Sequence, residues 1–453
     1  MNTEYALWPF IRPVLKVWAG CITLMVLLLA SSAVAEVGPR ARGMAGAVVA
    51  SASGPSAVEN NPAGLARNDM VALQLSGAVY QWSWQRTDDY FNVDLWDEKY
   101  SAAESGGTRN SVPAELLFAA PLKVSWLHSA GFAVGVVLPR MDELNLASTL
   151  ESADGRVNHA SWRRVSTQDV RAVAGLGIAP ASWVSLGATL EGVYVNDYYL
   201  WSTYSQVLDG KLHFEEVWQA RNEMNYMGLG LVVGLQLRPV KKLLELGAVI
   251  RLPFLRLREH TESWDQRLIV DNLAGELTAL PWMEETIVAR DTKNYETALS
   301  MASGIRSEIP RKCEMELNHV YTRKVGKGTK DTHDFRAGLD LIFLRPVILR
   351  LGAKTRLSNV DFARQMEGAM VGGQSADFYG ATFGTGYEFN GDGDKKRAIS
   401  LRSIDFGVEY MVGIGSAVAL NVTPWSTTES WSVSEASLAM HSLSFFVGAT
   451  LDW

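Results

Sequence analysis

The last stretch of the chain, residues 443–453, reads LSFFVGATLDW, and every second side chain in it is apolar. The apolar set is Leu443, Phe445, Val447, Ala449, Leu451 and Trp453. Because successive side chains of a β-strand point to opposite faces, a period of two residues places this set on one face. The stretch therefore predicts a strand whose two faces meet different surroundings. A strand of a β-sandwich could carry the same alternation.

Four other segments repeat this period, at residues 184–191, 229–237, 347–354 and 404–410. In each, the second face carries glycine and charged or polar residues, as the lumen side of a membrane barrel does. Lipid-facing and lumen-facing residues cancel in an average, so the mean hydropathy of +0.01 fits a barrel and excludes a multi-span helical membrane protein. We predict an all-β fold, a transmembrane antiparallel β-barrel.

The end of the chain also resembles the C-terminal signature of bacterial outer-membrane barrels, in which a terminal aromatic residue follows apolar residues at alternate positions. This resemblance implies a place in the bacterial outer membrane, in contact with its lipids. It also implies that the barrel-assembly machinery is a partner, acting on the strand that ends at Trp453.

Period-two segments and turn residues divide the chain into about fourteen strands. The connections alternate in length, with long ones such as 87–112 and 206–221 and short ones such as 180–182. Short periplasmic turns and long external loops produce this rhythm, and an even count returns both termini to the periplasm. The predicted strands are 70–86, 113–125, 131–144, 160–179, 183–205, 222–238, 242–261, 290–307, 311–324, 332–344, 347–361, 376–389, 400–415 and 439–453. The other long connections are 145–159, 262–289, 362–375 and 416–438.

The first 35 residues have the three parts of a secretory signal peptide. Arg12 and Lys16 precede an apolar run, and the run ends in small residues at Ala33 and Ala35. The apolar run is shorter than the roughly 20 residues that a membrane-spanning helix needs. We therefore expect export and cleavage after Ala35.

Charge and cysteine content narrow the function classes further. The formal net charge of −7 leaves no basic field for nucleic acid, so no such partner is expected. Of the two cysteines, Cys21 lies in the leader and Cys313 remains without a disulfide partner. The seven histidines that follow the leader are scattered, and neither a Ser-His-carboxylate set nor a metal-ligand spacing stands out. We expect no enzyme, no cofactor and no metal site.

Residues 36–69 do not alternate and are rich in glycine, alanine and serine. Such small residues before the first strand suit a plug folded into the lumen, where little volume is free. A flexible periplasmic tail is the alternative. We therefore divide the chain into a signal peptide at 1–35, a plug or hatch at 36–69 and a barrel at 70–453.

This segment carries a family resemblance. Residues 42–47 read RGMAGA and residues 56–66 read SAVENNPAGLA, which resembles the N-terminus of the FadL/TodX family. The family's Asn-Pro-Ala motif matches Asn61, Pro62 and Ala63. The resemblance covers roughly residues 36–80, and it implies a fourteen-stranded barrel with a hatch in the lumen. It also implies passive uptake of long-chain fatty acids or similar hydrophobic compounds, with no cofactor.

The motif also has a physical rationale. Pro62 fixes its own φ and pushes Asn61 toward an extended conformation, while Gly64 permits a turn. The Asn61 side chain could then hydrogen-bond backbone of the hatch or of the wall. A simple tight turn would use the same residues.

Members of this family release ligand sideways beside a kinked third strand, and the third predicted strand here contains Pro139. Proline removes a ladder donor and could break the strand. The reading that Pro139 marks the extracellular end of the strand is slightly favoured.

A fatty carboxylate in the lumen would need a cation or hydrogen-bond donors. Arg350, Lys354 and Arg356 share the inward face of one predicted strand, and Arg251 and Arg336 point inward on others. These are the candidate ligand-binding residues. An ion-pair network with Glu191, Asp340 and Glu409 would explain the same pattern and is the better reading for any single residue.

Apolar and aromatic residues could capture the ligand. Leu95-Trp96 and Leu280-Pro281-Trp282-Met283 lie in predicted loops, and Trp82, Trp84, Tyr198, Tyr199 and Trp201 could line a capture site or form an interfacial belt. Uptake of hydrophobic molecules is thus the first hypothesis. A PorV-like secretion-associated scaffold that binds protein partners, a general porin and an outer-membrane enzyme follow in that order.

Overall fold

The computed structural model describes residues 37–453 except 96–97, 210–211, 241–242, 272–277, 280–282, 288–297, 310–311, 325–328, 368–372, 390–399 and 423–430. The predicted signal peptide, Trp96, residues 280–282 and the segment 390–399 therefore lie outside the described residues.

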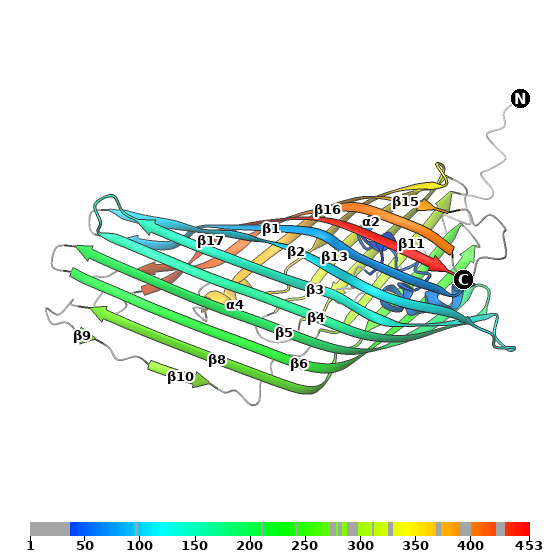
Figure 1. The fold of residues 1–453 in the computed structure, drawn as a ribbon, viewed down its shortest axis with the longest axis horizontal. Helices are drawn as coiled ribbons and strands as arrows, with labels where there is room; N and C mark the ends of the chain where they lie inside the picture. The colour runs from blue at the N-terminus through cyan, green and yellow to red at the C-terminus, as the bar shows by residue number, and fades with distance from the viewer. Residues whose placement is uncertain are drawn as a thin grey trace, which may run out of the picture.

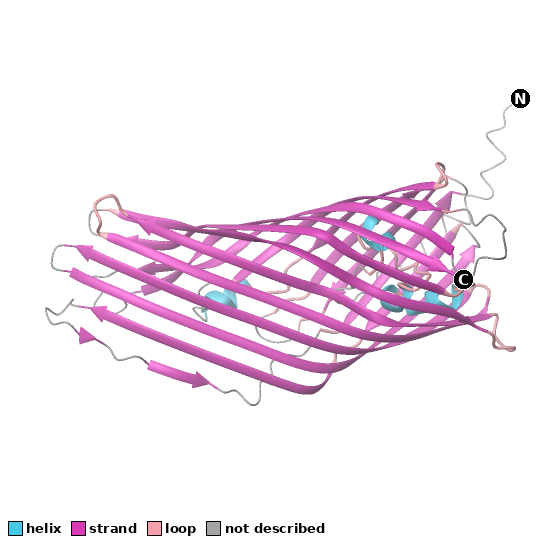
Figure 2. Ribbon diagram, viewed as in Figure 1, coloured by secondary structure: helices cyan, strands magenta, loops and turns pink. Residues whose placement is uncertain are grey.

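One antiparallel sheet closes on itself to form the barrel (Figures 1 and 2). β1 pairs with β17 from Ala72 opposite Asp452 to Thr87 opposite Leu438, which joins the first strand to the last. β7 and β8 occupy one position in the wall, because both pair with β6. β9, β10 and β11 occupy the next position, because all three pair with β7 or β8 in nearly one register, which gives a ring of fourteen strand positions. The predicted fold and strand number are confirmed.

The bounds of the elements follow in chain order. The helices are α2 (Pro39–Gly43), α3 (Ala57–Asn60), η2 (Pro62–Arg67) and α4 (Phe362–Glu367). The strands are β1 (Ala72–Asp94), β2 (Lys99–Leu122), β3 (Ser129–Glu151), β4 (Val157–Ala181), β5 (Val184–Asp209), β6 (Leu212–Val240), β7 (Leu244–Arg251), β8 (Leu255–Asp271), β9 (Thr278–Ala279), β10 (Met283–Ile287), β11 (Ser300–Ile309), β12 (Cys313–Thr322), β13 (Thr332–Leu341), β14 (Val347–Arg356), β15 (Gln374–Glu388), β16 (Ser400–Val422) and β17 (Trp431–Asp452).

The first six strands are longer than the alternation predicts, with 23–29 residues each. The predicted long loops at 87–112, 145–159 and 206–221 are wrong, because strand occupies most of each range. A tilted strand needs only about 9–11 residues to cross a bilayer. Beyond the lipid the outer face no longer has to be apolar, so the ladder continues without the alternation by which a strand is recognised.

The outer face of the barrel is apolar and the inner face is polar. Leu75, Leu190 and Phe406 are exposed, whereas the residues beside them in the chain, Gln74, Glu191 and Asp405, are buried inside. A closed barrel with this surface is built to sit in a bilayer. Among the described residues, no helix is both long and apolar enough to cross a membrane.

Residues 37–69, here called the inner segment, lie inside one end of the barrel, where Figure 1 shows α2 and the C-terminus. The short helices α2, α3 and η2 belong to this segment. We call this end the base and the opposite end the mouth. The inner segment is almost entirely buried, and its apolar residues Met44, Val58 and Leu65 have no exposed surface.

Candidate functional site

The inner segment is seated on glycines of the barrel wall. A Cβ added to any of nine inward glycines would come within 3.0 Å of an atom of the inner segment, too close for real structures. They are Gly131, Gly175, Gly177, Gly187, Gly234, Gly247, Gly338, Gly352 and Gly448, and they lie on eight strands. The wall therefore leaves out side chains where the inner segment passes.

Asn61 is the best-connected side chain of the Asn-Pro-Ala motif. Its Nδ2 donates to the carbonyl oxygen of Val49 at 2.8 Å and to that of Leu235, on β6, at 3.1 Å. Its Oδ1 accepts from the backbone N–H of Ala63 at 3.2 Å and caps η2, which begins at Pro62. One fully buried amide thus holds two parts of the inner segment to each other and to the wall.

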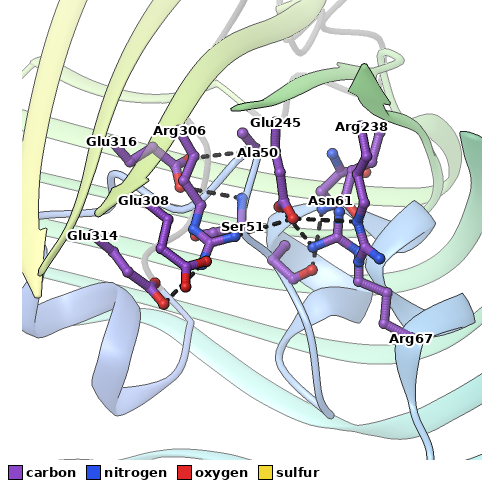
Figure 3. Close-up of polar contacts among 12 residues, drawn as sticks. Ala50, Ser51, Asn61, Arg67, Arg238, Glu245, Arg306, Glu308, Glu314 and Glu316 are labelled. Carbon is purple, nitrogen blue, oxygen red and sulfur yellow. Dashed lines mark hydrogen bonds and ion pairs between the residues drawn. The ribbon is translucent and has the colours of Figure 1, made fainter. Parts of the chain in front are cut away.

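Wall side chains satisfy the backbone of the inner segment in the way a neighbouring strand would. Glu316 on β12 accepts from the N–H groups of Ala50 at 2.7 Å and Ser51 at 3.1 Å (Figure 3). Glu115 on β2 accepts from the Gly38 N–H at 2.8 Å. Because buried backbone groups need partners, these contacts fix an otherwise irregular chain.

Ion pairs form a second set of attachments near the base. Arg40 bonds Glu314 at 3.0 Å and Asp340 at 2.9 Å. Arg67 bonds Glu245 at 2.9 Å, and Figure 3 shows this pair beside Asn61. Deeper inside, Glu59 on α3 bonds Arg251 on β7.

Three of the basic residues predicted to bind ligand are engaged by carboxylates. Arg251 bonds Glu59 and Glu191, Arg350 bonds Asp340 and Asp405, and Lys354 bonds Glu409 at 2.7 Å. The guanidinium of Arg356 lies 5.9 Å from the ring centroid of Phe378. Arg251 lies on β7 and the other three residues lie on β14, so the four do not make one site for a ligand carboxylate. The ion-pair reading describes the inner face, and it includes the three acidic partners predicted for it.

A cavity of about 700 Å³ lies between the inner segment and the base of the barrel. Arginines and carboxylates from the inner segment and the wall meet in its lining, among them Arg40, Arg67, Arg306, Glu245 and Asp340. A path straight through the base is therefore strongly polar, which disfavours an apolar solute.

The wall is interrupted between β2 and β3. The ladder pairs Gly107 with Asn145 and resumes at Glu115 with Val137, while residues 108–114 and 138–144 have no partner across this seam. Pro139 lies within the interruption, and the register of β3 against β4 shifts between Val137 and Arg140. The reading of Pro139 as a strand end is wrong, because β3 continues to Glu151. Proline lacks the N–H that a ladder bond needs, and the shift against β4 distorts β3 at the same point.

An apolar cluster connects the inner segment with this interruption. Val37, Val58 and Leu65 of the inner segment pack with Leu117 on β2 and Val137 on β3. Val137 is the last residue of β3 that pairs with β2 before the gap. The apolar side of the inner segment therefore adjoins the opening in the wall.

The aromatic candidates divide between the two faces. Trp82 and Trp84 are exposed on the outside, where Trp82 contacts Phe445 edge to face with ring centroids 5.7 Å apart. Trp201 is buried inside and its Nε1 donates to Ser161 at 3.3 Å. Leu95 is buried as well, so it is not an exposed loop residue that could capture ligand. Within the part of the chain that the structure describes, no three His, Cys, Asp or Glu side chains are grouped to hold a metal ion.

Several functional residues had no recognised signal in the sequence. In the sequence, the inward glycines indicated only that the lumen face carries small residues. Their recurrence on successive strands also indicates a folded segment inside the barrel. Glu59, Glu115 and Glu316 are isolated carboxylates in the sequence, and only the closed barrel brings them to the inner segment.

Solved structures with this architecture share little sequence with the chain. A Pseudomonas aeruginosa FadL homologue matches with a TM-score of 0.59 and 13% identity, over 93% of this chain and 100% of that one. The Pseudomonas putida toluene transporter TodX matches with a TM-score of 0.53 and 14% identity, over 93% and 99%. The Ralstonia pickettii toluene transporter TbuX matches with a TM-score of 0.52 and 10% identity, over 93% and 99%.

No protein-family model and no curated protein matches the sequence. The resemblance predicted from residues 36–80 nevertheless extends in three dimensions over nearly the whole chain. The chain therefore has the fold of the FadL and TodX transport barrels.

Proposed function

We propose that this protein is an outer-membrane channel that takes up hydrophobic compounds, with the inner segment as its hatch. Long-chain fatty acids and small aromatic hydrocarbons are the two ligand classes to compare, since the similar barrels are described as a FadL homologue and toluene transporters. No enzymatic step is proposed.

The observation that carries this proposal is the apolar contact between the inner segment and the broken β2–β3 seam. A ligand that reaches Val58 and Leu65 from the mouth is next to Leu117 and Val137, and beyond these residues the ladder has no hydrogen bonds to block passage. An apolar solute leaving there enters lipid, whereas the axial path meets the charged cavity. Lateral release is therefore our preferred route, and a shift of the inner segment would open it.

Uptake into proteoliposomes tests the function. Vesicles with the protein should accumulate labelled oleate or toluene faster than vesicles with a porin of similar size. In a variant lacking residues 37–69, opening of the channel should no longer depend on ligand. If no hydrophobic ligand is taken up, a scaffold that binds protein partners becomes the better reading.

Single-channel recording tests the porin alternative. The inner segment lies across the lumen at the base, so we expect little steady conductance in the intact protein. Large, constant conductance would favour a water-filled pore.

A further inference from the structure

The tip of β1 leaves the barrel wall and crosses the mouth. Pairing with β17 ends at Thr87, and residues 91–93 instead pair with residues 420–422 of β16. This is the only parallel pairing among the strands that the structure describes. The turn inward occurs at Asp89, whose φ of 50° is left-handed and unusual for a residue other than glycine. β2 follows the tip, since Phe91 to Asp94 still pair with Ala102 to Lys99.

The far edge of β16 is free to receive the tip. β15 pairs with β16 only as far as Ala417, opposite Gln374, so no described residue of β15 pairs with residues 420–422 on that side. The tip reaches this edge behind β17, and Asn92 Nδ2 donates to Asn421 Oδ1 at 3.0 Å. Residues 88–95, here called the tip, therefore form a strap across the interior of the mouth.

The tip brings its apolar residues into the lumen. Tyr90, Phe91, Val93 and Leu95 are each at most 2% exposed and pack with side chains of β4, β5 and β16. The ring of Phe91 stacks on that of His159, with centroids 3.6 Å apart and planes within 7°. An exposed hairpin end would be polar, so this packing marks an apolar compartment that the tip fills.

Below the tip lies a layer of small polar side chains. The ladder places one inward residue from each of five neighbouring strands in register, and each is 4% exposed or less. They are Thr87, Glu104, Ser148, Ser161 and Thr203. Gln85, also fully buried, precedes Thr87 on the same face of β1.

Most of this layer has unused hydrogen-bonding capacity. Both amide atoms of Gln85 and the hydroxyls of Thr87, Ser148 and Thr203 have no hydrogen-bond partner among the described residues. Each such group costs about 1–3 kcal/mol when buried unsatisfied. Glu104, the acid of the layer, is bonded by Arg163. The layer therefore offers neutral donors and acceptors.

We propose that the upper lumen is a binding site for an uncharged apolar compound with a hydroxyl or carbonyl group, and that the tip is its lid. The apolar part of the ligand takes the space of Tyr90 and Phe91, and the polar group bonds Gln85 and Thr87. A free carboxylate is disfavoured, because Arg163 is already bonded to Glu104, whose charge would repel a second acid. This inference rests on the proposed function and narrows its ligand class at the mouth.

The test measures opening of the lid without measuring transport. Val93→Cys, made in a Cys313→Ser background, places a thiol on the buried tip. The purified barrel is treated with a polar maleimide in the presence of p-cresol, toluene or 4-methylbenzoate. These probes match the Tyr side chain, the Phe side chain and a charged analogue.

We expect p-cresol to raise the labelling rate at least fivefold, toluene less and 4-methylbenzoate not at all. Gln85→Leu should remove the advantage of p-cresol over toluene. Val320→Cys, a buried position beside the inner segment, is the control and should not respond. Leu95→Cys at the same tip replaces Val93→Cys if that variant does not give a heat-modifiable barrel.

Unchanged labelling with p-cresol would overturn the proposal, as would an equal increase at Val320→Cys or an equal response to 4-methylbenzoate. Because the readout needs no uptake, it distinguishes failure of the mouth site from failure of the transport function. A protein that transports nothing yet opens its tip for p-cresol retains the site and loses the proposed function.

Discussion

Glu59 and Arg251 join the inner segment to the barrel wall through a buried ion pair, with Oε2 of Glu59 2.7 Å from Nη2 of Arg251. The two side chains are 0% and 6% exposed. Arg251 also donates to the Glu59 carbonyl oxygen at 3.3 Å and bonds Glu191 on β5. One guanidinium thus connects α3 with two wall strands. The ion pair forms only when the inner segment is docked in the barrel.

Glu59→Gln should loosen the inner segment without unfolding the barrel. Removing one partner of a buried pair costs about 3–5 kcal/mol, and the retained amide should keep the loss near about 3 kcal/mol. Trypsin should then cleave at Arg40, Arg42 or Arg67 about a hundredfold faster, since 1.4 kcal/mol is tenfold. Arg86→Gln breaks an exposed pair with Asp88 and serves as the control, with little expected change. Equal resistance of Glu59→Gln and the wild type would refute the docking role.

The same carboxyl sets an acid limit for docking. Burial opposes ionisation of Glu59, but Arg251 and Arg171 outweigh it and hold the pKa below the usual 4.5. Glu191 is the other carboxylate that bonds the Arg251 guanidinium. A lowered pKa gives stability that is complete above the undocked pKa and is lost as the pH falls through the docked pKa. Hydrogen exchange of residues 57–66 should stay slow down to about pH 5 and accelerate only below about pH 4.5. Loss of protection near neutral pH would contradict this assignment, and Glu59→Gln should abolish the acid transition.

Asn61→Ala should reduce ligand uptake while leaving barrel yield unchanged. The substitution removes the bonds to Val49 and Leu235 and leaves two buried carbonyls with less satisfaction, at about 1–3 kcal/mol. Uptake rates and heat-modifiable mobility on gels are measured together. Asn68→Ala is a matched control in the same segment, because the Asn68 amide nitrogen has no partner among the described residues. If both variants transport alike, the motif is only a turn.

Gly187→Ala should displace the inner segment, because the new Cβ would collide with the backbone of Pro62 and Ala63. The cost of such overpacking is about 1–3 kcal/mol, and the expected signs are faster trypsin cleavage and intermittent conductance. Gly192→Ala, on the outer side of the same strand, meets nothing closer than 3.9 Å and should behave as the wild type. A silent Gly187→Ala variant would show that the seat tolerates a side chain.

A disulfide between tip and wall should block uptake. Asn92 and Asn421 pair across the β1–β16 contact, so Asn92→Cys with Asn421→Cys in a Cys313→Ser background should crosslink on oxidation and lose transport until reduced. Asn92→Cys with Ser101→Cys joins the two strands of the tip hairpin to each other and should leave transport intact. Normal transport by the oxidised first pair would mean that the tip does not have to move.

The period-two pattern predicted the barrel because it reports a lipid face and a lumen face, the property that lipid enforces on each strand. It could not predict how far the strands continue, since residues such as Thr87 and Ser148 lie in the strand extensions and carry no such signal. The motif at Asn61 located the inner segment, because a proline and a glycine constrain backbone locally. Glu59 and Arg251 are 192 residues apart in the chain, so no local rule pairs them. The crossing of the tip to β16 was equally hidden, since it depends on an edge that β15 leaves open.

The inward glycines that contact the inner segment have a consequence for which mutations the barrel tolerates. A side chain gained at Gly177, Gly234 or Gly352 would collide with the inner segment and leave the lipid-facing surface unchanged. On the proposed function, the barrel would still assemble and would leak. The effect of such substitutions should therefore be measured as increased sensitivity of the cell to bulky antibiotics, rather than as lost growth on a nutrient. The inward glycines would then help to keep the outer membrane impermeable, because they leave room for the inner segment.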